Sequence, residues 1–161
     1  MASDTVKQYL KSKGLDHTIE LHIGSIDTVE HAAQQIGCTE AEIAKTLSFL
    51  VDEKPVIVVM AGDARVNSSK FKGKFHTKPH MIPREQVVDL IGHEPGGVCP
   101  FAIKEDVPVW LDVSMKRFEI VHPAAGDDYT SAKMTLDELF DASNAEGWCD
   151  VCKGWEEKIE I

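Results

Sequence analysis

A pair of adjacent strand-like segments near the middle of the chain constrains the fold most strongly. Residues 45–51 alternate between two faces, one of which carries Lys45, Leu47, Phe49 and Val51. Residues 56–61 are apolar on both faces, which is typical of a strand in the interior of a sheet. The polar turn at residues 52–55 joins the two segments and predicts a hairpin. Together they predict the centre of a β-sheet.

Helix signals lie on both sides of this hairpin. Ser3 is expected to cap a first helix that ends at Gly14, and Thr28 is expected to cap a second helix that ends at Gly37. Further signals are a capping box at Thr39–Glu42, a helix at 84–91 between Pro83 and Gly92, strands at 107–112 and 118–122, and a helix capped by Thr135–Glu138 that continues through Phe140. Because helices and strands are interspersed, the sequence predicts an α/β fold around a mixed sheet.

Length and composition favour a single domain. The chain has 161 residues, of which 43% are hydrophobic and 27% are charged, and a domain typically holds ~100–200 residues. We therefore expect one domain over residues 1–161, with residues 146–161 as a C-terminal extension packed on it. The longest apolar run, residues 55–62, is shorter than the ~20 residues of a membrane helix, and the N-terminus does not resemble a secretion signal. These features predict a cytoplasmic protein without a membrane partner.

The distribution of charge along the chain is uneven. The formal net charge is −10, yet residues 64–84 hold no Asp or Glu and carry six basic side chains. These are Arg65, Lys70, Lys72, Lys74, Lys78 and Arg84. A basic segment in an acidic protein can attract a polyanion while the remaining surface repels it. Two interpretations stay open at this point, namely a contact with nucleic-acid phosphates and a solvated lysine-rich turn.

The number and spacing of the four cysteines do not indicate a disulfide framework. Cys38 and Cys99 stand alone, whereas Cys149 and Cys152 form one Cys-x-x-Cys pair. A structural zinc ion needs four ligands, and neither a second pair nor a matching histidine pair follows this one. We therefore expect no metal, and we interpret the pair as small apolar side chains that pack with the neighbouring tryptophans. A thiol or metal protein centred on the pair is the alternative.

Two features indicate a reactive site. Lys45 lies on the strand face that the core would occupy, so its ammonium could project into a cleft and hold a phosphate or a ribose oxygen. The alternative is a side chain that simply reaches solvent. Residues 94–100 place two glycines between two prolines, and the backbone N–H groups of Gly97 and Val98 could donate to an oxyanion. An ordinary tight turn is the alternative for this loop.

The common catalytic motifs are missing from the sequence. It holds no Gly-x-Ser-x-Gly elbow, no Walker loop, no dinucleotide-binding glycine motif and no His-Glu-x-x-His helix. Asp127 and Asp128 are adjacent and do not face each other as a hydrolase carboxylate pair would. A nucleophilic Cys99 would require one of the seven histidines to lie beside it in space. These absences exclude the familiar motifs but leave an enzyme of another kind open.

Five segments together resemble a known family. They are Ile43–Phe49, Val59–Asp63, Gly92–Phe101, Leu111–Ser114 and Ala124–Gly126. In order and spacing they are similar to the YbaK-type aminoacyl-tRNA deacylases, which include the prolyl-tRNA editing domains, and the resemblance spans residues 5–145. It implies a partly barrel-like mixed sheet surrounded by helices. It also implies hydrolysis of tRNA that carries the wrong small amino acid, such as cysteine or alanine on the tRNA for proline, without a cofactor or metal.

The resemblance also assigns roles to individual residues. Lys45 is similar to the family's functional lysine, which holds the end of the charged tRNA. Gly96 and Pro100 match a loop whose backbone faces the scissile ester, and Gly97 and Val98 lie within that loop. The further predicted substrate contacts are Thr28, Gly126 and Ser131. Ser131 stands where some cysteine-specific members carry an aspartate, so the resemblance implies the deacylase class rather than specificity for cysteine.

The implied reaction requires no catalytic triad. A water molecule attacks the aminoacyl ester, the loop at residues 96–100 stabilises the oxyanion, and Lys45 fixes the terminal adenosine. A small pocket would admit only small amino acids. The acceptor-stem phosphates would meet Arg65, Lys70, Lys72 and Lys74.

The predicted partner is therefore the acceptor end of a mischarged tRNA, with a prolyl-tRNA synthetase as a second candidate partner. The sequence leaves the oligomeric state open. A catalytically silent tRNA- or synthetase-binding module on the same fold is the alternative to an enzyme, because a fold does not by itself fix a function.

Overall fold

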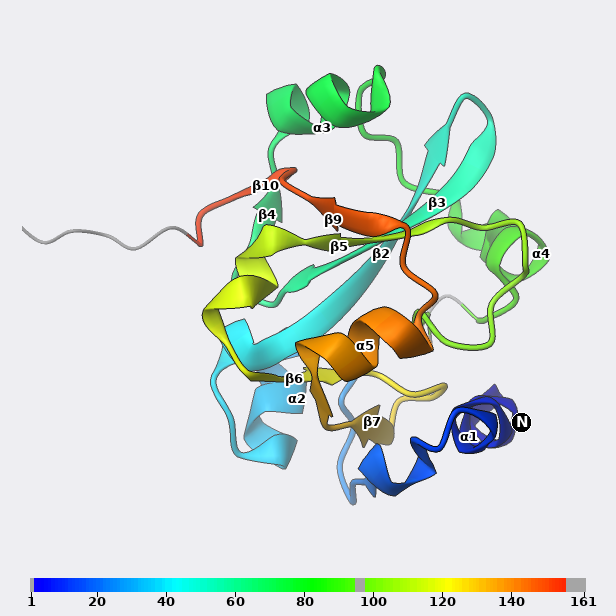
Figure 1. The fold of residues 1–161 in the computed structure, drawn as a ribbon, viewed down its shortest axis with the longest axis vertical. Helices are drawn as coiled ribbons and strands as arrows, with labels where there is room; N and C mark the ends of the chain where they lie inside the picture. The colour runs from blue at the N-terminus through cyan, green and yellow to red at the C-terminus, as the bar shows by residue number, and fades with distance from the viewer. Residues whose placement is uncertain (1, 95–97, 156–161) are drawn as a thin grey trace, which may run out of the picture.

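A central antiparallel hairpin organises the computed structural model, which describes residues 2–94 and 98–155. The main sheet has six strands in the order β8-β6-β2-β3-β5-β9 (Figure 1). Within it β2 (Ile43–Val51) pairs with β3 (Lys54–Ala61) over eight residue pairs. The turn between them contains Asp52 and Glu53, both with positive φ angles. The structure thus confirms the predicted hairpin and its place inside the sheet.

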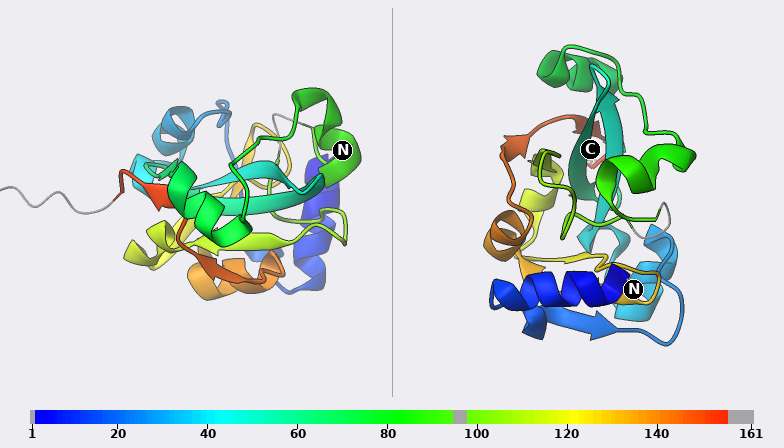
Figure 2. Two further views of the ribbon diagram at one scale, coloured as in Figure 1. Left: turned by 90° about the horizontal axis from the view of Figure 1, so that it is seen from above. Right: turned by 90° about the vertical axis from the view of Figure 1, so that its right-hand side faces the viewer.

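Parallel pairings extend this hairpin on both sides. β5 (Val109–Asp112) joins β3, and β9 (Gly147–Cys149) joins β5. On the other side β6 (Ile120–Pro123) runs parallel to the start of β2, and β8 (Met134–Thr135) pairs antiparallel with β6. The mixed sheet curls into a half-barrel that helices flank (Figures 1 and 2). This arrangement confirms the predicted α/β fold class.

Two small sheets connect segments that are distant in the sequence. β1 (Ile19–Leu21) pairs antiparallel with β7 (Thr130–Ala132), and β4 (Arg65–Val66) pairs antiparallel with β10 (Cys152–Lys153). The first pair brings the segment before α2 next to the end of β6. The second pair holds the C-terminal segment against the domain.

The described helices are α1 (Ala2–Ser12), α2 (Val29–Ile36), α3 (Ser68–Phe75), α4 (Val87–Ile91) and α5 (Leu136–Ala142), with 3₁₀ turns η1 (Asp16–Thr18), η2 (Glu40–Glu42), η3 (Arg84–Gln86) and η5 (Val113–Arg117). Thr28 caps α2 as predicted, because its hydroxyl accepts a hydrogen bond from the His31 N–H at 3.0 Å. Thr135 and Glu138 form the predicted capping box of α5. No helix in the described parts of the chain is long and apolar enough to cross a membrane.

Two helix predictions need correction, and one helix is not predicted by the sequence. α1 begins at Ala2, so Ser3 lies inside its first turn and is not its cap. Residues 84–91 form a 3₁₀ turn followed by the short α4 instead of one helix. No helix is predicted within the basic segment, yet α3 forms there. Its cap is Asn67, whose side chain accepts a hydrogen bond from the Lys70 N–H at 3.1 Å.

The hydrophobic core surrounds β3, and a smaller apolar cluster lies under α2. The residues of β3 from Val56 to Ala61 are all buried. The rings of Phe49 and Phe71 lie 4.9 Å apart and pack α3 onto the hairpin. The smaller cluster consists of Ile26, Ala32, Ala33 and Ile43. It positions the start of α2 beside the beginning of β2, where the candidate site lies.

Candidate active site

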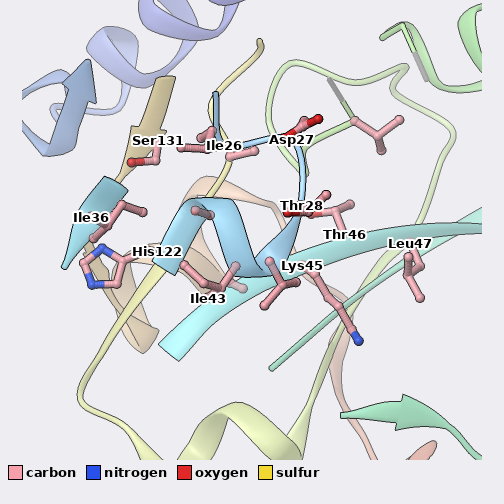
Figure 3. A pocket seen from close by; sticks show the side chains of 15 residues that line it. Ile26, Asp27, Thr28, Ile36, Ile43, Lys45, Thr46, Leu47, His122 and Ser131 are labelled. Carbon is pink, nitrogen blue, oxygen red and sulfur yellow. The ribbon is translucent and has the colours of Figure 1, made fainter. Parts of the chain in front are cut away.

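A cavity of about 280 Å³ lies between the start of α2 and the sheet. One wall comes from the turn that precedes α2 and from one face of α2, and another comes from residues 43–47 of β2 (Figure 3). The β6–β7 region supplies a third wall. Four of the predicted site residues meet in the lining of this cavity, namely Thr28, Lys45, Val98 and Ser131.

The lining of the cavity is aliphatic with a few polar side chains. Three isoleucines form much of the apolar surface, namely Ile26 of the turn before α2, Ile36 of α2 and Ile43 of β2. The polar lining residues are Asp27, Thr28, Lys45, Thr46, His122 and Ser131. Sites for small molecules commonly combine apolar walls with a few such polar groups. Sequence reasoning missed Asp27, Thr46 and His122, although the predicted strands already contained Thr46 and His122.

Thr28 and Thr46 lie at the same end of the cavity (Figure 3). The Thr28 hydroxyl is held in place because it caps α2. Thr46 Oγ1 is buried and has no hydrogen-bond partner among the residues that the structure describes. A buried polar atom without a partner destabilises a protein by ~1–3 kcal/mol. The Thr46 hydroxyl is therefore suited to receive a hydrogen bond from a bound molecule or to donate one.

Lys45 lines the cavity with its stem, while its ammonium points away from Thr28 (Figure 3). Lys45 Nζ donates to the Gly62 carbonyl at 3.4 Å and also to the Ala64 carbonyl. Burial lowers the pKa of this ammonium. The alternative in which Lys45 simply reaches solvent is therefore wrong. To meet a substrate, the ammonium would have to turn from the two carbonyls toward the cavity.

Ser131 contributes a hydroxyl that is held by a histidine. It is 1% exposed, and its Oγ lies 2.6 Å from Nε2 of His22, within hydrogen-bond distance. The pairing of β1 with β7 sets Ser131 opposite Glu20 and so brings His22 to this wall. Gly126 has a φ of 110° in the turn between β6 and β7, a conformation that favours glycine. It shapes this wall without lining the cavity.

The predicted oxyanion loop is described only in part. Gly96 and Gly97 lie outside the described residues, so their roles stay predictions. Val98 lines the cavity as expected. Pro100 is buried and lines a separate cavity of about 400 Å³, together with Tyr9 of α1. The structure thus brings the end of the loop at Val98, but not Pro100, to the lining of the candidate site.

Comparison with known proteins identifies the family. Residues 24–142 match the aminoacyl-tRNA editing domain, and this span contains every residue that lines the cavity. This chain belongs to the aminoacyl-tRNA editing domain family.

Relatives in sequence and in structure support the assignment. YwhH of Bacillus subtilis (strain 168), an uncharacterized protein, is 43% identical over 130 residues, which cover 80% of this chain and 83% of YwhH. Proline–tRNA ligase of the same organism is 30% identical over 108 residues, which cover 66% of this chain but only 19% of the ligase. Among solved structures, one described as a candidate trans-editing enzyme for prolyl-tRNA synthetase has a TM-score of 0.85 at 24% identity, and covers 95% of this chain and 98% of its own. The hypothetical protein APE2540 has a TM-score of 0.82 at 27% identity, with 92% and 99% covered.

Cys99 of this editing domain is not placed as a nucleophile. Its side chain is fully buried and does not line the cavity. Burial raises the pKa of the Cys99 thiol to about 12, so the thiol stays protonated at neutral pH. Its Sγ lies 3.6 Å from Nε2 of His93, which in turn is 2.7 Å from the Phe101 carbonyl oxygen. The histidine that a nucleophilic Cys99 would require is therefore present, but the buried thiol lies outside the lining of the cavity, which argues against that role.

The four basic residues predicted to contact phosphates, Arg65, Lys70, Lys72 and Lys74, do not line the cavity. α3 stands at the end of the molecule opposite α2 (Figures 1 and 2). Lys70 Nζ donates to Asp150 at 3.1 Å, and Lys74 Nζ lies 3.6 Å from the centre of the Trp110 ring. Arg65 lies in β4, which pairs with the C-terminal β10. Three of the four predicted phosphate contacts therefore also hold parts of the domain together, and Lys72 is exposed.

The Cys-x-x-Cys pair is part of the packed interior of the editing domain. Cys149 in β9 and Cys152 in β10 are both buried, and burial raises the pKa of the Cys149 thiol to about 12. Cys152 Sγ lies 3.5 Å from Met60 Sδ, and Asp112 accepts a hydrogen bond from the Val151 N–H at 2.8 Å. This confirms the interpretation of the thiols as packed side chains. Residues 2–94 and 98–155 contain no group of three or more His, Cys, Asp or Glu residues placed to hold a metal ion.

Proposed function

We propose that this editing domain is a trans-editing hydrolase that releases a small amino acid from mischarged tRNA by hydrolysing the 3′-aminoacyl ester. The observation that carries the proposal is the cavity at the start of α2. It gathers Thr28, Lys45, Val98 and Ser131, which the family resemblance assigns to the substrate. Cysteine or alanine on the tRNA for proline is the substrate that we propose first, since a segment of proline–tRNA ligase is among the relatives.

The proposed reaction depends on placement of the ester more than on a nucleophilic side chain. An ester is already more reactive than an amide, so water can attack its carbonyl carbon once the ester is held still. Backbone N–H groups of the 96–100 loop, including that of Val98, would stabilise the negative oxygen that forms. Removal of one such donor typically lowers kcat by ~10²–10³-fold. The proposal therefore needs no catalytic triad.

Lys45 has a holding role in this proposal. Its stem lines the cavity, and its ammonium is bound to the carbonyls of Gly62 and Ala64. Rotation about the stem would bring the ammonium to an oxygen of the terminal nucleotide. Hydrogen bonds from a charged donor are roughly twice as strong as neutral ones. The compact charge of lysine, with three donor hydrogens, suits this task better than the planar guanidinium of arginine.

The size of the cavity favours a small amino acid. The volume of about 280 Å³ must accept the side chain of the amino acid together with the ester. Ile26, Ile36 and Ile43 limit the space at its walls. A close-packed wall of this kind rejects larger side chains by steric overlap, as in the editing sites of synthetases. The proposed partners are the acceptor end of the tRNA and, secondarily, a prolyl-tRNA synthetase.

Hydrolysis of a panel of misacylated tRNAs by the purified chain tests the proposal. We expect release of small amino acids, near-complete loss of activity in Lys45→Ala, and impaired activity in Lys45→Arg. Lys7→Ala, which removes an exposed lysine of α1, is the matched control and should retain activity. Thermal melting of each variant establishes that it is folded.

Two results would contradict the proposal in different ways. Full turnover by folded Lys45→Ala would refute the assignment of the lysine. Binding of charged tRNA by the wild type without hydrolysis would identify a silent binding module instead of an enzyme.

A further inference from the structure

Two residues that line the cavity each have a buried polar atom without a hydrogen-bond partner in the described protein. Among the described residues, four buried side-chain nitrogen or oxygen atoms have no hydrogen-bond partner. Two of these four, Thr46 Oγ1 and His122 Nδ1, belong to residues that line this one cavity. Buried polar groups in proteins are nearly always hydrogen-bonded. Two of the four thus belong to the lining of one cavity, where a bound molecule could supply the missing partners.

His122 lies at the end of the cavity away from Lys45 (Figure 3). It belongs to β6, where the strand register sets it opposite Ile43, and it is only 7% exposed. Its ring lies beside Ile36 and Ile43 (Figure 3). Thr28 and the stem of Lys45 mark the other end. Because the proposed function assigns Lys45 to the terminal nucleotide, the ester would lie toward that end. The His122 end is thus the end left for the side chain of the amino acid.

The imidazole of His122 is neutral at physiological pH. Burial lowers its pKa; the carboxylates of Glu20 and Glu42 act in the opposite direction, without reversing the shift. The nearby Lys133 and His22 lower the pKa further. A neutral imidazole has one donor nitrogen and one acceptor nitrogen in either tautomer. Either tautomer can therefore bind a hydroxyl group, which both donates and accepts.

We propose that His122 is a specificity-determining residue that forms a hydrogen bond with a hydroxyl group on the side chain of the mischarged amino acid. The inference rests on the proposed function, keeps its class of small mischarged amino acids, and replaces cysteine or alanine as the first substrate with a small hydroxyl-bearing amino acid. Seryl-tRNA and threonyl-tRNA are then better substrates than alanyl-tRNA and valyl-tRNA.

The expected preference follows from the hydrogen bonds that each substrate side chain forms or leaves unformed with His122. A hydroxyl group loses its hydrogen bonds to water when it enters an aliphatic cavity, and His122 restores one of them. An alkyl side chain of the same size leaves the buried imidazole nitrogen without a partner in the complex. Sites built to bind a hydroxyl group discriminate strongly for this reason. One net hydrogen bond corresponds to a preference of roughly tenfold.

The experiment measures kcat/KM for one tRNA charged in turn with serine, alanine, threonine or valine. Threonine and valine match in size, so their ratio isolates the effect of the hydroxyl group. For the wild type we expect at least about a tenfold preference for serine over alanine and for threonine over valine. His122→Phe keeps a ring but removes the nitrogens, and it should bring both ratios close to one, mainly by slowing the hydroxyl substrates.

Two further variants separate specificity from structure. His122→Asn keeps a polar atom near the position of Nδ1 and should retain much of the preference. His17→Phe replaces an exposed imidazole of η1 outside the cavity and should leave both ratios unchanged. Thermal melting of all variants identifies any that do not fold.

The outcomes distinguish this inference from the function on which it rests. Unchanged ratios in folded His122→Phe would overturn the role of His122, while hydrolysis of the panel would still support the deacylase. If His122→Phe does not fold, the comparison of the wild type with His122→Asn decides. A wild type without a preference for threonine over valine, or ratios that His122→Asn leaves unchanged, overturns the inference, whereas a partial fall of both ratios in His122→Asn supports it. If the wild type hydrolyses none of the charged tRNAs, the proposed function fails and the inference fails with it.

Discussion

Substitution of Gly62 by alanine should destabilise the editing domain, because the site has no room for a methyl group. Gly62 directly follows β3, and a Cβ atom there would lie 2.1 Å from the Glu40 carbonyl oxygen and 2.8 Å from Cγ1 of Val29. The oxygen belongs to the backbone and cannot rotate away, so η2 and the end of β3 must separate. Overpacking of this kind typically costs ~1–3 kcal/mol. At ~2–4 °C per kcal/mol for a chain of this size, the melting temperature should fall by roughly 2–12 °C.

The same substitution should slow hydrolysis beyond its effect on stability. The Gly62 carbonyl accepts a hydrogen bond from Lys45, and Val29 lines the cavity. A backbone shift at Gly62 therefore displaces both the lysine and the start of α2. Misplacement of a positioning group by ~1 Å can reduce a rate by ~10²-fold. We expect kcat/KM of folded Gly62→Ala to fall by about 10–100-fold.

Gly73→Ala provides the matched control. Gly73 lies inside α3, and no described atom outside its helical neighbours lies within 4 Å of a Cβ built there. Alanine in a helix interior is more stable than glycine by roughly 0.5–1 kcal/mol, so the melting temperature should rise by about 1–4 °C. Thermal melting and deacylation of the wild type and both variants under one set of conditions make the comparison. A Gly62→Ala variant that melts and hydrolyses like the wild type would refute the steric argument.

Two remaining predictions concern the basic segment and the cysteine pair. Lys72→Gln should reduce the slope of the logarithm of tRNA affinity against the logarithm of salt concentration by roughly 0.7–0.9. Lys70→Gln should mainly lower the melting temperature. Equal slopes for the wild type and Lys72→Gln would contradict a phosphate contact. Cys149→Ala/Cys152→Ala should keep deacylase activity and lose about 1–2 kcal/mol of stability. Lost activity in the folded double variant, or a melting temperature that a chelator lowers, would instead indicate a redox or metal role.

Local patterns in the sequence predict the centre of the fold well. The hairpin of β2 and β3 follows from alternation in one strand, an apolar run in the next and a polar turn between them. Thr28 and Thr135 are correctly predicted as caps, because capping depends on a few neighbouring residues and on little else. These predictions succeed where the deciding interactions lie within one or two turns of chain.

Pairings between strands that are distant in the sequence could not be predicted from local patterns. β4 and β10 have two residues each, and Cys152 pairs with Val66 from far along the chain. Strands this short show no alternation, so only the assembled tertiary structure selects their partners. α3 had a usable signal in Asn67, but its lysines favoured the interpretation as a basic surface over that of a helix. The structure combines the two, since Lys70 and Lys74 also bind the C-terminal segment and β5.

Lys45 is the site residue whose orientation depends most on tertiary structure. The alternation of β2 fixes the direction of its Cβ, but the rotatable bonds of its stem decide where the ammonium goes. The carbonyls of Gly62 and Ala64 that bind it follow the end of β3, and no pattern around Lys45 reports their positions. An ammonium has three donor hydrogens, so it can keep one backbone carbonyl while it turns toward a substrate oxygen. In the proposed function, the two carbonyls hold the charge at the edge of the cavity until tRNA binds, so a backbone shift at Gly62 should affect the rate as well as the stability.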